Sequence, residues 1–142
     1  MTGTVRRAVA GDADALAECI TAAYARYAGL TLPEVAEGIP QEITDHLVWV
    51  FETDGAIAGG IMVSKDGDTA HLRNIAVHPK HSGQGLGSAL IRTAIDALCA
   101  EGVRSVVLAT HVGIPENVAL YSHLGWVETG RTGDKILMSR VI

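Results

Sequence analysis

The sequence predicts an α/β fold, in which a mixed central β-sheet is flanked by helices and has one parallel pair of strands at its centre. Two observations predict it. Residues 46–77 contain strand-like runs separated by short glycine turns, and residues 71–110 run as strand, glycine-rich turn, helix and strand. A helix that connects two strands of one sheet makes a right-handed crossover, so these two strands are parallel.

Length, composition and charge limit the classes of protein. The 142 residues are expected to form one domain, residues 1–142, and such a domain buries roughly two-thirds of its unfolded surface. The apolar runs are too short to cross a bilayer and the N-terminal MTGTVRR lacks the apolar core of a secretion signal, so we expect a cytoplasmic protein without a membrane partner. The net charge is −5 and the 11 basic residues are scattered, which argues against nucleic-acid binding.

The chain begins with an expected strand and helix. TVRRAV at 4–9 is the first strand. Asp12 stands at the N-cap of a helix whose apolar residues recur at helical spacing as far as Tyr27. Residues 33–40 are expected to form a loop with room for one helical turn.

Three strands are expected next. HLVWVFE at 46–52 and AIAGGIMVS at 56–64 flank Thr53-Asp54-Gly55, a turn that is typical of a hairpin. A second glycine turn precedes the strand at 71–77, and Pro79 ends that strand because proline cannot donate to a sheet.

The second half alternates helices and strands. From Leu86 the apolar period becomes helical, and Gly102 stands where a helix C-terminus favours glycine. The strand at 104–110 is a continuous apolar run of the kind that is buried on both faces. A short helix over 115–125 follows, and the chain closes with two antiparallel strands at 126–129 and 135–141.

The turn SGQGLGS at 82–88 leads from a strand into a helix. Backbone N–H groups at a helix N-terminus lack intrahelical acceptors and lie at the positive end of the helix dipole, so they favour an anion such as phosphate. No Gly-Lys-Ser/Thr follows the glycines, as a P-loop requires, and the strand at 104–110 does not end in the acid of a dinucleotide-binding fold. A tight turn without a ligand stays an alternative for this segment alone.

A second motif lies in the helix at 115–125, where Asn117 and Tyr121 are four residues apart and share one face. Together, LRNIAVHPKHSGQGLGSALI and ENVALYSHLGWVETGR resemble the GNAT superfamily of acetyl-CoA-dependent N-acetyltransferases, and the resemblance extends from the first strand to Met138. It implies a GNAT-like sheet with the parallel pair of strands at the cofactor site. The family usually has Arg or Gln at the position of Ser82, so we expect somewhat weaker coenzyme A binding.

The resemblance also implies a cofactor site for acetyl-CoA. The strand edge at 75–77 would pair with the pantetheine amides, while the glycine turn binds the pyrophosphate. Asn117 would bond the pantetheine arm, and Tyr121 would donate a proton to the departing CoA thiolate, a packed aromatic being the alternative reading of Tyr121. The implied cofactor-binding residues are Ile75, Ala76, Val77, Ser82, Gly83, Gln84, Gly85, Leu86, Gly87, Ser88, Asn117 and Tyr121.

Many members of the superfamily have a Glu on a central strand as the base that takes the proton from the amine, and this chain has none there. His111, whose ordinary pKa is about 6.5, is the candidate catalytic base, with a surface histidine as the alternative. Asn74 could instead hold a water that relays the proton. The candidate substrate-binding residues are Tyr24, Tyr27, Asn74 and Thr110, although core packing is an alternative for both tyrosines.

No metal site is expected, because neither the six histidines nor the two cysteines show ligand spacing. The main hypothesis is an acetyltransferase that moves an acetyl group from acetyl-CoA to a primary amine, of a small molecule or a peptide, by direct attack in a ternary complex. A catalytically weak acyl-CoA-binding regulatory module is the alternative, and a nucleotide-binding protein is a third. A homodimer through the exposed edge of the last strands is left open.

Overall fold

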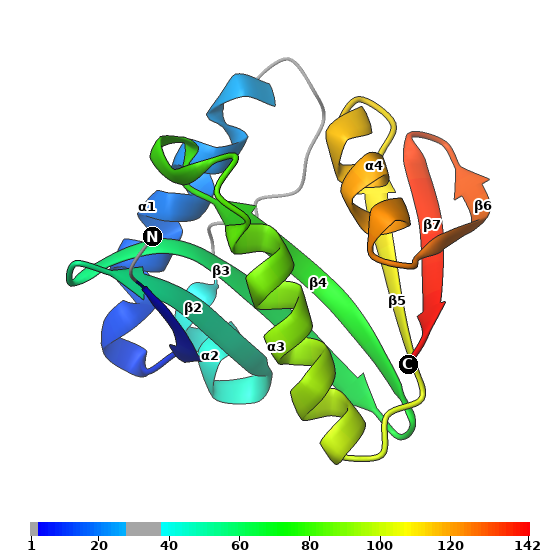
Figure 1. Cartoon of the computed structure of the whole chain (residues 1–142), viewed down its shortest axis with the longest axis horizontal. Coiled ribbons are helices and arrows are strands. Elements are labelled where there is room, and N and C mark those ends of the chain that lie inside the picture. Colours follow the sequence, from blue (N-terminus) through cyan, green and yellow to red (C-terminus); the bar gives the residue numbers. More distant parts are fainter. Residues whose placement is uncertain (1–2, 28–37) are drawn as a thin grey trace.

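The computed structural model describes residues 3–27 and 38–142. Their strands are β1 (Thr4–Arg7), β2 (Leu47–Thr53), β3 (Ala56–Asp66), β4 (Thr69–Val77), β5 (Ser105–His111), β6 (Val127–Thr132) and β7 (Lys135–Val141). They form one sheet in the order β1-β2-β3-β4-β5-β7-β6 (Figure 1). Only β4 and β5 pair in parallel within this described sheet, so the predicted mixed sheet with one parallel pair is confirmed.

Helices cover both faces of the sheet. One apolar cluster joins α1 (Ala13–Tyr24) and α2 (Ile39–Asp45) to the strands β2, β3 and β4. The other joins α3 (Leu86–Ala100) and α4 (Pro115–His123) to the opposite face, which also includes β5 and β7. Short 3₁₀ turns occupy Ala10–Asp12, Ala25–Tyr27 and Pro79–His81. None of the helices in the described ranges is long and apolar enough to span a membrane.

The helix predicted from Leu86 is confirmed together with its C-terminal glycine. Five apolar residues of α3 are buried at helical spacing. Gly102 has a φ of +84°, and its N–H and that of Val103 donate to the carbonyls of Cys99 and Leu98. This is the left-handed ending that a residue without a Cβ adopts at no steric cost.

Asp12 is the N-cap residue of α1, as predicted, but its side chain makes no capping bond to this helix, because its carboxylate binds the Arg6 guanidinium and accepts the Val9 N–H. Two other local expectations need correction. Residues 39–45 form the helix α2, where no helix beyond a single turn was expected; the remainder of that predicted loop, 33–37, lies outside the described residues. Strand β1 ends at Arg7, before the 3₁₀ turn, and not at residue 9.

The prediction that the strand at 104–110 is buried on both faces is wrong. In β5 the burial alternates, with Val106 and Leu108 buried while Val107 is 37% exposed. The reason is that helices pack on only one face of β5. The apolar cluster that contains α3 and α4 includes β5, whereas the cluster of α1 and α2 on the other face includes only β2, β3 and β4.

Two irregularities in β4 open the sheet. Met62 pairs with Asn74 and Val63 with Leu72, so Arg73 is the extra residue of a β-bulge. The parallel pairing of β4 with β5 stops at the pair His71–Val107. Beyond this pair the two strands are no longer bonded to each other, and the edge of β4 from Leu72 onward has no partner in β5.

Candidate active site

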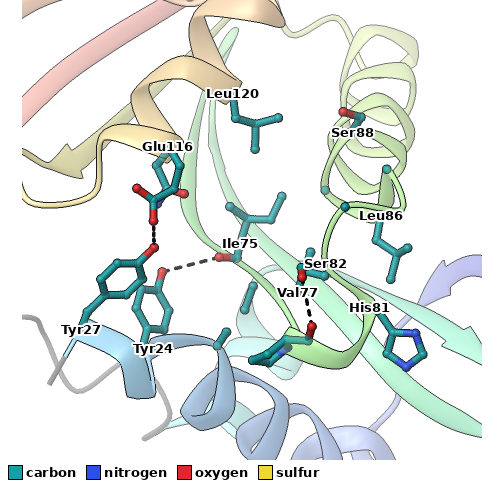
Figure 2. A pocket seen from close by; sticks show the side chains of 17 residues that line it. Tyr24, Tyr27, Ile75, Val77, His81, Ser82, Leu86, Ser88, Glu116 and Leu120 are labelled. Carbon is teal, nitrogen blue, oxygen red and sulfur yellow. Dashed lines mark hydrogen bonds between the residues drawn. The ribbon is translucent and has the colours of Figure 1, made fainter.

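The first pocket lies where β4 leads into α3, and we call it the turn pocket. It has a volume of about 390 Å³. Figure 2 shows part of its wall, which includes the side chains of Ile75 and Val77 of β4 and of Leu120 of α4. Ten of the predicted cofactor-binding residues line it: Ile75, Ala76, Val77, Ser82, Gly83, Gly85, Leu86, Gly87, Ser88 and Asn117. Gln84 and Tyr121 do not line this pocket.

The glycine turn leaves its backbone open to the turn pocket. Gly83 and Gly85 have φ values of +76° and +80°, a region that side chains with a Cβ rarely adopt, and open space surrounds the position of a Cβ at each. Gly85 is the N-cap of α3 and provides no side-chain cap. The first N–H groups of this 15-residue helix therefore lack an acceptor inside the helix and can bind an anion.

The second pocket lies between the separated ends of β4 and β5, and we call it the cleft pocket. Its volume is about 530 Å³. It is lined by the predicted residues Tyr24, Asn74, Thr110, His111 and Tyr121. Tyr24, Ile75 and Asn117 line both pockets, so the turn pocket and the cleft pocket adjoin at these three residues.

Tyr24 and Tyr27 come from the end of α1 and the turn after it, and they reach different walls. The Tyr24 hydroxyl donates to Asn74 Oδ1 at 2.9 Å. Burial, and then the neighbouring Tyr27, raise the pKa of Tyr24 to about 12. The Tyr27 hydroxyl donates to Glu116 Oε1 in the first turn of α4 (Figure 2). Tyr24 thus borders both pockets, and Tyr27 borders the turn pocket.

Tyr121 is both a packed aromatic and a pocket residue. It is 4% exposed, and its ring meets the Trp126 ring edge-on at 5.9 Å between centroids. The indole Nε1 of Trp126 in turn donates to the Val106 carbonyl at 3.1 Å, which fixes this aromatic pair to β5. Burial, and then Tyr24, raise the pKa of Tyr121 above its ordinary value, so the phenol keeps its proton at neutral pH.

His111 lies at the end of β5 with its side chain 13% exposed. Its Nδ1 accepts the Gly113 N–H at 2.8 Å. Its Nε2 lies 3.8 Å from Asp134 Oδ2, which is too far for a hydrogen bond. Within residues 3–27 and 38–142, Asn74 Nδ2 and His111 Nε2 are the only buried side-chain nitrogen or oxygen atoms without a hydrogen-bond partner.

The sequence did not indicate how the rim of the cleft pocket is built. Arg73, the bulge residue, makes an ion pair with Glu42 of α2, with 2.8 Å between Nη2 and Oε1 and 3.0 Å between Nε and Oε2. This pair joins two elements 31 residues apart, so no local spacing could have predicted it. The Tyr27–Glu116 contact is a second link of this kind. No group of three or more metal-ligating side chains occurs in the described part of the chain.

Comparisons with known proteins agree with this geometry. The model of the acetyltransferase (GNAT) family matches residues 16–126. N-acetyltransferase 8 of Rattus norvegicus is 34% identical over 95 residues, 63% of this chain and 43% of the rat protein. The ribosomal protein bS18-alanine N-acetyltransferase of Escherichia coli K12 is 43% identical over 61 residues, 43% of this chain and 41% of that protein. The match thus spans less than half the length of either relative.

Among solved structures, the PaiA N-acetyltransferase of Thermoplasma acidophilum in complex with coenzyme A has the same fold. The TM-score is 0.91 at 19% identity, and the match covers 100% of both chains. The family model covers most of this chain, and it includes β4, the glycine turn and the helix of Asn117 and Tyr121. The chain therefore belongs to the GNAT acetyltransferase family, whose members use acetyl-CoA as cosubstrate.

Proposed function

We propose that this protein transfers an acetyl group from acetyl-CoA to a primary amine, of a small molecule or a peptide, in a ternary complex. One observation carries the proposal: the turn pocket and the cleft pocket adjoin at Tyr24, Ile75 and Asn117. Two adjoining pockets allow both cosubstrates to be bound at once, and holding two reactants together accelerates a direct attack. The single sheet, which takes strands from Thr4 to Val141, supports treating residues 1–142 as one catalytic domain.

In this proposal the turn pocket holds the cofactor. The free N–H groups at the start of α3, from Gln84 to Ser88, would take the pyrophosphate. The edge of β4 at Ile75–Val77, unpaired with β5, would accept the pantetheine amides as an added strand, and Asn117 would bond the same arm. This path leads from the turn pocket to its junction with the cleft pocket.

The chemical step follows from the cleft pocket. The amine nitrogen forms a bond to the thioester carbon, the carbon–sulfur bond breaks, and the electron pair leaves with the CoA sulfur. Tyr121 lines the cleft pocket as a neutral phenol and would donate its proton toward this sulfur. Since burial raises its pKa, the phenol is available as a donor through the whole physiological pH range.

The amine must also lose a proton. The sequence offers two candidates to take it, His111 and a water held by Asn74, and the structure does not suit them equally. A neutral imidazole carries one ring proton, and His111 Nδ1 already accepts the Gly113 N–H. The ring proton therefore lies on Nε2, and His111 can act as a base at the cleft pocket only if the Gly113 bond breaks. We therefore favour a water held by the Asn74 Nδ2 donor, which would accept the amine proton and pass it on to solvent.

The test is release of the CoA thiol from acetyl-CoA with a panel of primary amines. We expect turnover with at least one amine, and a loss of about 10²- to 10⁴-fold in kcat for Tyr121→Phe, the range for losing a general acid. Coenzyme A should stabilise both proteins equally in a thermal-shift assay. Binding without turnover on any acceptor would favour the regulatory module, and stabilisation by ATP or NAD but not by coenzyme A would favour a nucleotide-binding protein.

A homodimer also remains a proposal. Three exposed apolar residues lie on the last two strands, β6 and β7: Val127, Leu137 and Val141. Gel filtration with light scattering would decide it, a mass of one chain arguing against the dimer.

A further inference from the structure

Asn74 and His111 leave two buried donors in one pocket. Asn74 is 9% exposed, its Nδ2 has no partner, and the same is true of His111 Nε2 among the described residues. Both residues line the cleft pocket. Leaving a buried polar atom unpaired is unfavourable, so such atoms are usually bonded to protein or to a ligand.

Both nitrogens are fixed as donors by their neighbours. The Tyr24 hydroxyl donates to Asn74 Oδ1, so the amide oxygen is turned toward α1 and the NH₂ group is turned away from it. The Gly113 N–H occupies Nδ1 of His111, so the proton of the neutral ring is on Nε2. These two side chains therefore present three N–H bonds and no acceptor to the cleft pocket: two from the Asn74 NH₂ group and one from His111 Nε2. One N–H of Asn74 can hold the relay water proposed above while the other binds the acceptor.

The backbone places the two donors on the same side of the cleft. Before the Arg73 bulge, Leu72 belongs to the apolar cluster of α3; after it, Ala76 belongs to the cluster of α1 and α2, so Asn74 faces α1. In β5, Leu108 faces α3, and strand alternation turns His111 to the opposite face. Asn74 and His111 thus project from facing strands toward the same face.

They also lie at similar heights. The last parallel pair is His71–Val107. Asn74 is three residues beyond it, one of them the bulge residue Arg73, and His111 is four, so at roughly 3.3 Å a residue the two side chains leave their strands within about two residues of the same level. The unpaired ends of β4 and β5 leave the space between them to a ligand.

We propose that Asn74 Nδ2 and His111 Nε2 bind an oxygen of the acceptor, and that the acceptor carries a carbonyl or carboxylate group next to its amine. The inference rests on the proposed acetyl transfer and names the class of its substrate: an α-amino carbonyl compound, which is an amino acid or the N-terminal residue of a peptide. The formal charges on the wall do not decide between a carbonyl and a carboxylate, since Arg73 is paired with Glu42 and the Asp134 carboxylate, 3.8 Å from His111 Nε2, accompanies Lys135.

The test compares three acceptors of similar size. Glycinamide has a carbonyl, glycine has a carboxylate and propylamine has neither. Two ratios are measured in wild type and in each variant. One is kcat/KM for glycinamide divided by kcat/KM for propylamine, and the other is kcat/KM for glycine divided by kcat/KM for propylamine. The amines differ in pKa, but this difference cancels when the ratios of two proteins are compared.

The variants separate the donors from the rest of the site. Asn74→Asp keeps an oxygen that accepts from Tyr24 and replaces the NH₂ donor with a second oxygen. His111→Phe removes the Nε2 donor, while His111→Gln supplies an N–H of similar reach. We expect both ratios to fall about tenfold in Asn74→Asp and in His111→Phe. In Asn74→Asp the ratio for glycine should fall further, because the new carboxylate repels the carboxylate of glycine. In His111→Gln both ratios should partly recover. A change in overall rate common to all amines cancels in the ratios.

The outcomes also distinguish this inference from the proposed function. Acetylation with equal ratios in wild type, Asn74→Asp and His111→Phe would overturn the oxygen site and leave the acetyltransferase intact. If coenzyme A binds without turnover, the same three acceptors are titrated onto the coenzyme A complex in a thermal-shift assay, and equal stabilisation by all of them would overturn the site. If coenzyme A does not bind, the proposed function fails, and the inference fails with it.

Discussion

The Tyr24 hydroxyl donates a 2.9 Å hydrogen bond to Asn74 Oδ1 and so ties the end of α1 to the bulged end of β4, 50 residues further along the chain. Tyr24 borders both pockets, and Asn74 lines the cleft pocket. One bond therefore sets the orientation of a side chain in the site and fixes a helix to the sheet.

Replacing Tyr24 with Phe removes this bond and leaves Asn74 Oδ1 without its partner. We expect a loss of about 1–3 kcal/mol in the free energy of unfolding, the cost of leaving a buried polar group unpaired. The KM for the acceptor should rise, because the Asn74 amide is then free to rotate. Urea unfolding and steady-state kinetics measure the two effects.

Tyr27→Phe is the matched control, because it removes the more exposed tyrosine bond to Glu116. Its loss of stability should be smaller than that of Tyr24→Phe. Equal losses of stability in the two variants would show that the Tyr24–Asn74 bond contributes no more to folding than the Tyr27–Glu116 bond.

The buried phenol of Tyr121 and the partly buried phenol of Tyr24 predict alkaline destabilisation. Burial raises the pKa of Tyr24 to about 12 and that of Tyr121 above its ordinary value, whereas an unfolded tyrosine ionises near pH 10. Because the folded state holds these protons more tightly, their contribution to stability is complete below pH 10 and is lost as the pH rises toward the folded pKa. For Tyr24 the loss at pH 11 is about 1 kcal/mol.

Urea unfolding at pH 9 and pH 11 measures this effect. Tyr24→Phe and Tyr121→Phe should each lose less stability than the wild type between the two pH values, since phenylalanine has no proton to release. If both variants lose as much stability between pH 9 and pH 11 as the wild type, groups other than these two phenols cause the alkaline destabilisation.

The parts of the fold that were predicted correctly have local causes. The apolar stripe of α3 and the glycine at position 102 each specify their conformation within a few residues. The helix α2 was missed because it has only seven residues and is held by tertiary contacts, which include the packing of Ile39 and Ile43 and the ion pair of Glu42 with Arg73. Helices this short depend on such contacts, and sequence spacing does not show them.

The expectations for the candidate site also divide into those with a local motif and those without one. The glycine turn and the pair Asn117–Tyr121 are motifs, and ten of the twelve cofactor residues expected from the resemblance line the turn pocket. The bulge at Arg73 and the Gly113 bond to His111 have no sequence signature. Yet they decide which way Asn74 faces and which nitrogen of His111 carries the proton, so the roles of these two residues could not be derived from residue type alone.

Placing a carboxylate in the glycine turn should abolish cofactor binding. Wild type saturated with coenzyme A at 100 times its Kd should gain about 2.7 kcal/mol, or several degrees in Tm. Gly85→Glu should lose this gain, because its carboxylate competes with the pyrophosphate for the N–H groups of α3. Gly85→Gln is the matched control: it has the same backbone strain at a φ of +80° and no charge, and open space surrounds the Cβ in both.

We expect Gly85→Gln to retain part of the stabilisation by coenzyme A. If both variants fold and lose it equally, the side chain acts by bulk and not by charge. If both retain it in full, the pyrophosphate does not bind at the glycine turn.

Replacing Ser82 with Arg should strengthen coenzyme A binding. The Ser82 hydroxyl donates to the Pro79 carbonyl of its own turn at 3.0 Å, so the side chain is turned away from an anion at the N-terminus of α3 (Figure 2). An Arg at this extended, exposed position can reach a phosphate oxygen with its guanidinium, and an exposed ion pair of this kind lowers the Kd about two- to fivefold. Isothermal titration calorimetry with coenzyme A at two salt concentrations measures the gain, which should shrink at high salt because exposed charges are screened. Ser82→Ala, which only removes the bond to Pro79, should leave the Kd almost unchanged; an equal gain in Ser82→Ala and Ser82→Arg would assign the effect to the turn and not to the new charge.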